Sequence, residues 1–422
     1  MVMVPRKKLK KAAQGGVIAA LDVGSSKVCC LIGQVGEGNA IKVIGSGYQS
    51  SQGVRAGAVI NLEDAEVAIG NAVHMAEQMV GVTIRDVFVN VSGGHPTSQT
   101  VGVEVAVLDQ EVTEIDLRRA LAQGRAHHRI SENEVIHAIP VTYSLDGNRG
   151  IRDPRGMFGD RLGVQLNIVT AHAGPLRNLF TSIARCHLDI EGLAVSPYAS
   201  GLACLVDDEI DMGVTCIDMG GGITTIAIFL EGNLVYTDCV PVGGGHVTND
   251  IARVLTTPLG HAERMKILYG NTMSSSADER EMINVPLVGE DDRSQGNQVS
   301  KATLVGIIQP RLEELFELVR NRLEASGVAG MAGRRVVLTG GACQLPGTRE
   351  LAQRILGRQV RIGRPARVQG LTETTSGPAF STAAGLLIQA TRRHTELSVS
   401  NSTGTTSGNL LGRVSLWLRD NL

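Results

Sequence analysis

The sequence predicts an α/β protein made of two related halves. An apolar strand, a glycine-containing turn and a second apolar strand occur at residues 17–35, and the same pattern returns at residues 214–230. The aspartates at the two turns, Asp22 and Asp218, are about 196 residues apart (218 minus 22). A repeat of this kind indicates two structural units of one type. The length of 422 residues agrees, because single domains typically have about 100 to 200 residues.

The composition indicates which kinds of partner and which cellular compartment to expect for this protein. Charged residues make up 19% and the formal net charge is -2, so no overall field favours nucleic acid, and none is expected as a partner. The seven cysteines form no Cys-x-x-Cys pair, and we expect reduced thiols rather than disulfides or metal ligands. The basic N-terminus lacks the apolar segment of a secretion signal, and no stretch approaches the ~20 apolar residues that span a bilayer. We therefore expect a cytoplasmic protein.

Changes in polarity divide the halves further. Between residues 94 and 170 the pattern reads as strand, helix, strand, strand, which predicts a small module inserted into the first half. The predicted divisions are a basic flexible N-terminus at 1–16, the first half at 17–93 and 171–206, the inserted subdomain at 94–170, the second half at 207–246 and 301–392, its outer subdomain at 247–300, a flexible linker at 393–408 and an amphipathic helix at 409–422.

Two helices rich in small residues are predicted to connect the halves. One follows Ser196 and Pro197, which we expect to be an N-cap and the first helical residue. The other passes through Ala383, Ala384 and Gly385. Small side chains let two helices cross closely, as a hinge between domains requires. A long amphipathic helix is also predicted at 301–325, with a bend at its proline.

The two glycine turns have the chemistry of a phosphate site. Glycine lets backbone N–H groups approach phosphate oxygens without a Cβ in the way. Asp22 and Asp218 would hold a Mg²⁺ bound to those phosphates, and they would do so through water because Mg²⁺ keeps most of its waters. The alternative interpretation of each motif alone is an ordinary hairpin with a glycine turn. The candidate phosphate contacts are Gly24, Ser25, Ser26 and Lys27 in the first turn and Gly220, Gly221, Gly222 and Thr224 in the second. Strand alternation leaves open whether Lys27 points to the phosphates or elsewhere.

A third glycine turn follows the apolar strand at 336–339. Its residues Gly340, Gly341 and Ala342 precede a helix, where a turn can lie against a nucleoside and its α-phosphate. The glycine run at 243–245 has two open interpretations, a turn into a helix or a further phosphate contact. The sequence contains no Walker A, G-x-S-x-G or H-E-x-x-H motif, which excludes the chemistries that those motifs carry.

In this order, the motifs at 22–27, 218–225 and 338–342 resemble the phosphate-1, phosphate-2 and adenosine motifs of the actin, sugar-kinase and chaperone ATPase superfamily. The resemblance implies an actin-like two-domain α/β fold with ribonuclease-H-like halves, and ATP with Mg²⁺ in the cleft between them. Residues 262–266 resemble the short helix of that superfamily whose Glu and Lys, here Glu263 and Lys266, touch ribose and adenine.

Within the superfamily the chain is most similar to the FtsA family of cell-division proteins, over nearly its whole length. Residues 240–252, 308–315 and 360–363 carry the resemblance, and the inserted module stands where that family has its own subdomain. The extra basic residues before Gly15 depart from the family pattern. The resemblance implies an ATP-binding protein that tethers FtsZ filaments to the membrane, assembles with itself into actin-like filaments and recruits later division proteins.

Other functions within the superfamily stay open at this point. A small-molecule kinase would need a carboxylate base near the γ-phosphate, and no such residue is identified in the sequence. An actin-like scaffold of another membrane machine, such as a pilus, is the second alternative. Whether ATP is hydrolysed, and which residue would be catalytic, is not assigned.

The last residues of the chain have the pattern of a membrane-binding helix. Leu410, Leu411, Val414, Trp417 and Leu418 share one helical face, and the single tryptophan suits a membrane interface. A helix that packs back on the protein would show the same stripe, but the flexible linker before it favours the membrane. These residues predict a peripheral protein on the cytoplasmic side of the inner membrane, at the division site.

Overall fold

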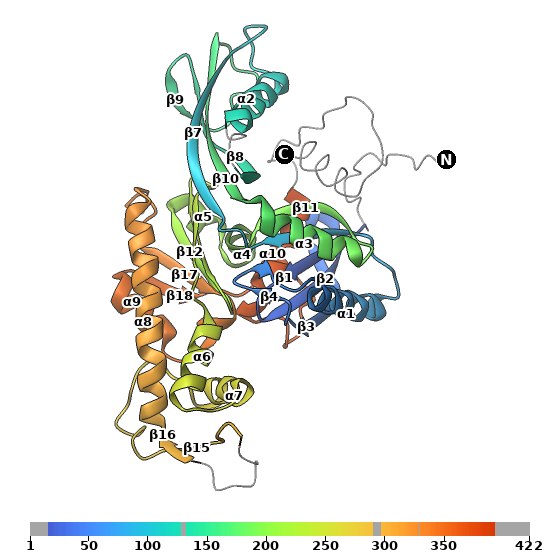
Figure 1. Ribbon diagram of the computed structural model, residues 1–422. Coiled ribbons are helices and arrows are strands. Elements are labelled where there is room, and N and C mark those ends of the chain that lie inside the picture. Colours follow the sequence, from blue (N-terminus) through green and yellow to red (C-terminus); the bar gives the residue numbers. More distant parts are fainter. Residues whose placement is uncertain (1–15, 128–131, 290–296, 329, 393–422) are drawn as a thin grey trace.

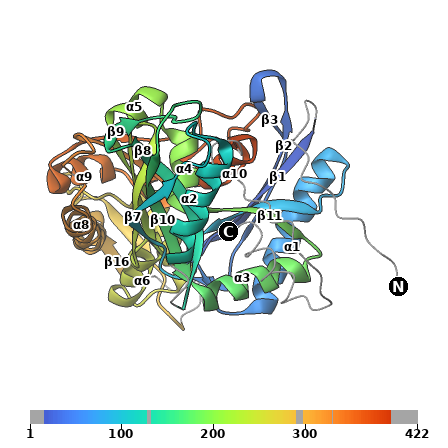
Figure 2. The same ribbon diagram turned by 90° about the horizontal axis from the view of Figure 1, so that it is seen from above.

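The structure is a computed structural model that describes residues 16–127, 132–289, 297–328 and 330–392. The predicted linker and amphipathic helix at 393–422, and the basic segment up to residue 15, lie outside these described residues. Two α/β halves lie side by side, with α4 (Ser196–Cys204) and α10 (Ser381–Arg392) between them (Figures 1 and 2). Among the described helices, none is both long and apolar enough to cross a bilayer.

The first half contains a five-stranded sheet in the order β11-β6-β1-β2-β3. The strands β1, β2 and β3 pair antiparallel, and β6 and β11 extend the sheet in parallel. The bounds are β1 (Val17–Val23), β2 (Lys27–Val35), β3 (Ile41–Ser50), β6 (Asp86–Val91) and β11 (Asp189–Val195), with β4 (Val54–Arg55), β5 (Ala58–Val59), α1 (Leu62–Val80), α3 (Ala173–Arg185) and the 3-10 turn η1 (Glu37–Asn39) around it. Its buried strands are almost continuously apolar, as expected of a sheet covered on both faces.

The second half repeats this sheet in the order β14-β13-β12-β17-β18, again with three antiparallel strands and then two parallel ones. The bounds are β12 (Val214–Met219), β13 (Thr224–Leu230), β14 (Asn233–Val240), β17 (Arg335–Thr339) and β18 (Gln359–Ile362), with α5 (Asp207–Met212), α6 (Gly244–Val254), α7 (Leu259–Tyr269), α8 (Lys301–Ala325), α9 (Thr348–Leu356), β15 (Met282–Val285), β16 (Asn297–Ser300) and the 3-10 turns η2 (Gly341–Gln344) and η3 (Pro378–Phe380). The equal strand order confirms the two related halves of the predicted fold.

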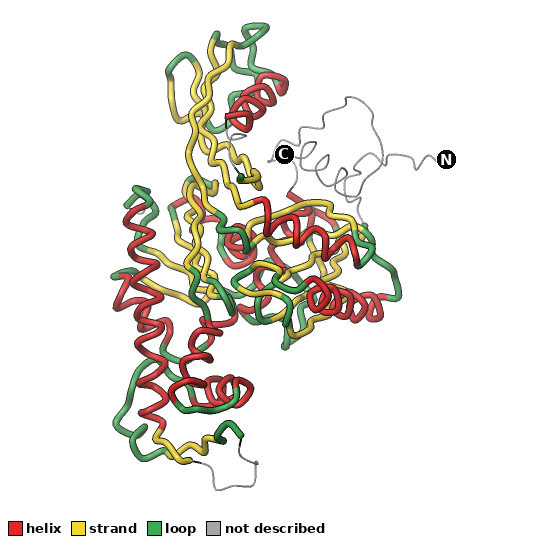
Figure 3. The backbone as a smooth tube through the Cα atoms, viewed as in Figure 1, coloured by secondary structure: helices red, strands yellow, loops and turns green. Residues whose placement is uncertain are grey.

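An inserted subdomain projects from the two halves, at the top of Figures 1 and 3. Its antiparallel sheet has the order β7-β10-β8-β9, and α2 (Glu114–His127) covers one face over a separate apolar core. The strands are β7 (Thr97–Ala106), β8 (Asn133–Leu145), β9 (Asn148–Ile151) and β10 (Arg161–His172). The predicted order of strand, helix, strand and strand therefore matches β7, α2, β8 and β10, and it missed β9. That strand is only four residues long, too short to give a clear alternation in the sequence.

The long helix α8 runs without interruption from Lys301 to Ala325 and contains Pro310. The Ser300 hydroxyl caps it by accepting a hydrogen bond from the Thr303 N–H at 3.3 Å. Its buried side chains complete the core of the second half. The end of α8 that carries Lys301 meets β15 and β16, far from the inserted subdomain (Figure 1).

The two small-residue helices cross at Gly385. A Cβ on this glycine would lie 1.7 Å from the backbone oxygen of Ala199, so only glycine permits the observed packing. The expected N-cap is one residue out of place, because α4 begins at Ser196 and Val195 is the cap. The Ser196 hydroxyl instead accepts a hydrogen bond from the buried amide of Asn90 at 3.1 Å.

We predict that Gly385→Ala destabilises the protein by about 3 kcal/mol, the upper end of the usual cost of overpacking, because the added methyl group collides with backbone rather than with a side chain that can rotate. Urea unfolding followed by circular dichroism measures the change. Gly306→Ala is a matched control within a helix, since a Cβ there meets nothing within 4 Å. That control should gain about 0.5 to 1 kcal/mol. Equal stability of the two variants would contradict the close crossing.

Candidate nucleotide site

The two glycine turns have the same backbone geometry. The Gly24 N–H donates to the Lys27 carbonyl at 3.0 Å, and the Gly220 N–H donates to the Ile223 carbonyl at 3.0 Å. A Cβ on Gly24 or Gly220 would lie 2.9 or 2.8 Å from those same carbonyl oxygens. Each turn therefore needs glycine at this position. The repeat that was found in the sequence is also a repeat of turn structure.

The turns of the two halves touch each other. A Cβ on Gly221 would lie 2.8 Å from the Ser26 side chain, and one on Gly222 would lie 2.7 Å from the Ser25 hydroxyl. The Ser25 hydroxyl accepts a hydrogen bond from the Gly57 N–H at 2.9 Å, which fixes its position. The structure thus brings together predicted contacts from both halves, in a space that larger residues would fill.

The start of α6 supports the second turn from behind. The N–H groups of Gly244 and Gly245 donate to the carbonyls of Gly220 and Gly221, at 2.9 and 2.7 Å. These two amides are already used within the protein. Of the two interpretations of residues 243–245, the structure therefore favours a turn into a helix over a phosphate contact.

Other candidate residues gather around the same end of α6. The Lys266 ammonium donates to the Gly244 carbonyl at 3.1 Å, to the Thr248 hydroxyl at 2.9 Å and to the Glu263 carboxylate at 2.7 Å. A Cβ on Gly244 would lie 3.0 Å from the Ala342 methyl group. The helix α7 and the third glycine turn are thus adjacent to the second glycine turn, as the predicted nucleoside site beside a predicted phosphate site requires.

Asp22 and Asp218 lie at the ends of equivalent strands and are each 8% exposed. Asp218 accepts hydrogen bonds from the hydroxyls of Ser200, on α4, and Thr382, on α10, the latter at 3.0 Å. A Cβ on Gly340 would lie 2.3 Å from the other oxygen of Asp218, so the third turn also passes directly beside this carboxylate. Sequence reasoning missed Ser200 and Thr382, because a hydroxyl in a small-residue helix gives no signal of its partner.

Burial shapes the electrostatics of both aspartates. It raises the pKa of Asp22 to about 6, an effect that the Lys27 charge opposes and the Asp218 charge adds to. Burial also raises the pKa of Asp218, while the hydrogen bonds from Ser200 and Thr382 and the charge of Lys27 act in the opposite direction. Two buried carboxylates that repel each other are a donor set suited to a hard divalent cation such as Mg²⁺. The residues present therefore fit the expected metal.

Two predicted phosphate contacts are engaged elsewhere in the structure. The Lys27 ammonium donates to the carbonyl of Ala379 and lies 4.1 Å from the centroid of the Phe380 ring. The Thr224 hydroxyl donates to the Val242 carbonyl at 2.7 Å, and its side chain is fully buried. The hydroxyl hydrogen of Thr224 is thus not available to a phosphate, because its strand position turns the side chain inward.

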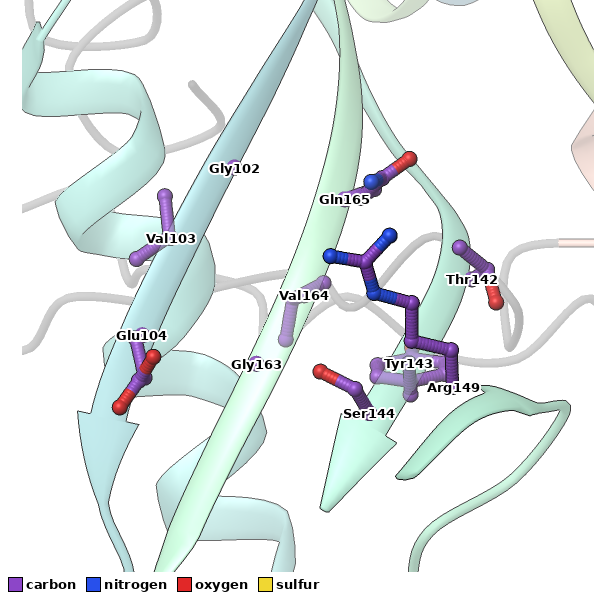
Figure 4. A pocket seen from close by; sticks show the side chains of 10 residues that line it. All are labelled: Gly102, Val103, Glu104, Thr142, Tyr143, Ser144, Arg149, Gly163, Val164 and Gln165. Carbon is purple, nitrogen blue, oxygen red and sulfur yellow. The ribbon is translucent and has the colours of Figure 1, made fainter. Parts of the chain in front are cut away.

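A separate cavity of about 260 Å³ lies on the sheet of the inserted subdomain (Figure 4). Its lining includes Gly102, Glu104, Ser144, Arg149 and Gln165, on the sheet face that α2 leaves open. It contains none of the predicted nucleotide contacts. The evidence for the candidate nucleotide site is therefore the arrangement of the glycine turns and the two carboxylates, and not this cavity.

Fold and site together define an actin-like protein with two ribonuclease-H-like halves. Solved structures of similar fold include the PilM-PilN type IV pilus biogenesis complex (TM-score 0.63, 18% identity, 89% of this chain and 98% of that one) and MreB5 of Spiroplasma citri bound to ADP (TM-score 0.50, 14% identity, 89% and 95%). The family described as "Cell division protein FtsA" matches residues 215–385, and the "SHS2 domain inserted in FTSA" matches residues 93–170.

Curated relatives match along almost the whole chain. The cell division protein FtsA of Agrobacterium fabrum is 43% identical, over 99% of this chain and 97% of the relative. That of Rhizobium meliloti is 44% identical over the same shares, and that of Escherichia coli K12 is 33% identical over 97% and 99%. The chain belongs to the FtsA family of cell division proteins.

We predict that Asp22→Asn stabilises the nucleotide-free protein at high pH. The folded-state pKa of about 6 lies above the ordinary value of 3.8, so the folded protein binds more protons than the unfolded chain between these values. Stability therefore falls as the pH rises through this window, by at most about 3 kcal/mol. The gain in Asp22→Asn should be near zero at pH 4 and largest at pH 8, by urea unfolding. Exposed Asp189, changed to Asn, is the control, and a gain independent of pH would contradict the assignment.

Proposed function

We propose that this protein is an ATP-binding tether that holds FtsZ filaments at the inner face of the cytoplasmic membrane during division. The observation that carries the proposal is the contact between two equivalent glycine turns from opposite halves, with a buried aspartate beside each, in a chain of the FtsA family. Self-assembly into actin-like filaments and recruitment of later division proteins belong to the same proposal.

In the proposed site, both halves of the protein contact the bound ATP. Backbone N–H groups of the two turns other than those of Gly24 and Gly220, together with Ser25 and Ser26, would bind the phosphates. Asp22 and Asp218 would hold Mg²⁺ through its water shell. Bound Mg²⁺ would offset the charges of the carboxylates and phosphates. The nucleoside would lie against Glu263, Lys266 and the turn at 340–342, and the fold is shared with a structure that holds ADP. A ligand gripped by both halves favours their closed arrangement, which biases filament assembly.

The membrane part of the proposal rests on the sequence at 409–422. Burial of its five large apolar side chains contributes at most roughly 7 to 15 kcal/mol, before the costs of ordering the helix and restraining the protein. A single copy is therefore a weak anchor. Several copies joined in a filament bind firmly, because the second and later contacts form at a high effective concentration.

We predict that the full chain sediments with anionic liposomes in Mg-ATP, and that a chain ending at Gly408 stays in the supernatant. The loss is expected because the truncation removes the whole apolar stripe. Trp417→Glu in the full chain is a milder variant that places a charge on the same stripe and should also reduce binding. Equal sedimentation of all three proteins would contradict the tether and direct attention to phosphotransfer assays, which test the kinase alternative.

The contact with FtsZ is proposed for the outer subdomain of the second half. The last turn of α7 exposes Ile267 and Leu268, at 66% and 57%, beside Tyr269 and the nearby Met273. Neighbouring exposed apolar side chains are typical of protein interaction sites. They lie at the end of the molecule opposite the inserted subdomain (Figure 1), so a filament bound there would leave that subdomain accessible.

We predict that Ile267→Glu weakens co-sedimentation with FtsZ filaments at least about tenfold, because it places a charge within an apolar contact. The charge reversal Arg264→Glu, one turn earlier, should weaken it less. Val67→Glu on α1 is the control, since Val67 is an equally exposed apolar residue of the first half. ATP binding should be unchanged in all three variants. Wild-type co-sedimentation by Ile267→Glu would exclude this surface.

A further inference from the structure

One oxygen of Asp218 is held by hydroxyls from both connecting helices. Ser200, on α4, donates to Oδ2, and Thr382, on α10, donates to the same oxygen at 3.0 Å. The two hydroxyl oxygens are themselves 2.9 Å apart. All three side chains are buried, and the residues are far apart in sequence. This group of three oxygens is therefore a product of the way in which the helices cross.

The arrangement leaves the other oxygen of Asp218 facing the third glycine turn. A Cβ on Gly340 would lie 2.3 Å from Oδ1, so the absence of a side chain there leaves room for this oxygen. Since Oδ2 accepts both hydroxyl hydrogens, the carboxylate cannot rotate without breaking two hydrogen bonds. The orientation of Oδ1 is thus set by α4 and α10.

We propose that Ser200 and Thr382 are positioning residues, which orient Asp218 so that Oδ1 meets hydrated Mg²⁺ and which thereby connect nucleotide binding to the packing of the two helices. The inference rests on the proposed ATP site. Partners that hold a metal-binding carboxylate typically affect metal affinity by about 10- to 100-fold. Any shift of α4 against α10 moves one hydroxyl relative to the other, and so disturbs the carboxylate that both hold.

A second buried hydroxyl group nearby supplies the control. The Ser381 hydroxyl is 2.7 Å from that of Thr339 and accepts a contact from the Cys204 thiol at 3.1 Å. Ser381 precedes Thr382 in the chain and is also buried, but its hydroxyl contacts Thr339 and Cys204 rather than Asp218. Removal of its hydroxyl tests the general effect of a lost buried hydrogen bond at the same helix end.

The experiment measures ATP binding by isothermal titration calorimetry with the full chain, both in EDTA and across a Mg²⁺ titration. Ser200→Ala and Thr382→Val should raise the Mg²⁺ concentration needed for half-maximal binding by about 10- to 100-fold, with unchanged binding in EDTA. Thr382→Ser restores the hydroxyl and should behave like the wild type, as should Ser381→Ala. The thermal shift on adding Mg-ATP should follow the same order and provides a readout independent of hydrolysis.

The outcomes separate this inference from the proposed function. Wild-type Mg²⁺ dependence in Ser200→Ala and Thr382→Val would overturn the positioning role while leaving the ATP site intact. An equal rise in Ser381→Ala, or no rescue by Thr382→Ser, would overturn it as well, because the effect would then come from packing. A wild-type chain that binds no ATP would overturn the proposed function and the inference together. If Thr382→Val fails to fold, Ser200→Ala and Thr382→Ser still decide the result.

Discussion

The two halves meet at places where only backbone fits between them. At Gly221 and Gly222 an added Cβ would meet the serines of the opposite turn, and at Gly385 it would meet the backbone of α4. These glycines set how closely the halves approach, and the close approach brings Asp22 and Asp218 into one electrostatic environment. The sheets, connectors and loops of each half are arranged around this narrow contact.

The close contact has an electrostatic cost. Two carboxylates are withdrawn from water beside each other, and burial favours their protonated forms. Lys27 offsets part of the repulsion through its charge, although its ammonium is hydrogen-bonded to Ala379. Two buried carboxylates that repel each other lower the stability of the folded protein, and a bound cation would offset that repulsion. A binding site that reduces the stability of the empty protein is a common compromise between stability and function.

The parts of the fold that sequence predicted are those that repeat or have a strong local pattern. The turns at Gly24 and Gly220 were recognisable because each requires glycine at the same place in a strand, turn, strand pattern. The directions of single side chains were not recognisable. Whether Lys27 and Thr224 face a ligand depends on neighbours such as Phe380 and Val242 that are distant in sequence.

The same limit explains the missed hydroxyls of the connecting helices. Ser200 and Thr382 are small residues in helices composed of small residues, and close packing accounts for them without a functional role. Only the crossing of α4 and α10 shows that both donate to one carboxylate. Local sequence shows secondary-structure propensity and hydrophobic periodicity, whereas hydrogen bonds between residues distant in the chain depend on the tertiary structure.

The inserted subdomain is anchored at its base to both halves. The buried amide of Asn167 donates to the Leu234 carbonyl of the second half at 2.9 Å, and the Ser98 hydroxyl accepts from the Thr237 N–H at 2.7 Å. On the other side, His137 accepts a hydrogen bond from the Val195 N–H of the first half at 3.0 Å. A body fixed to two supports tilts when the supports turn against each other. Because the outer end of the inserted subdomain lies far from these anchors, a small rotation of one half against the other would displace that end by a larger distance than the base.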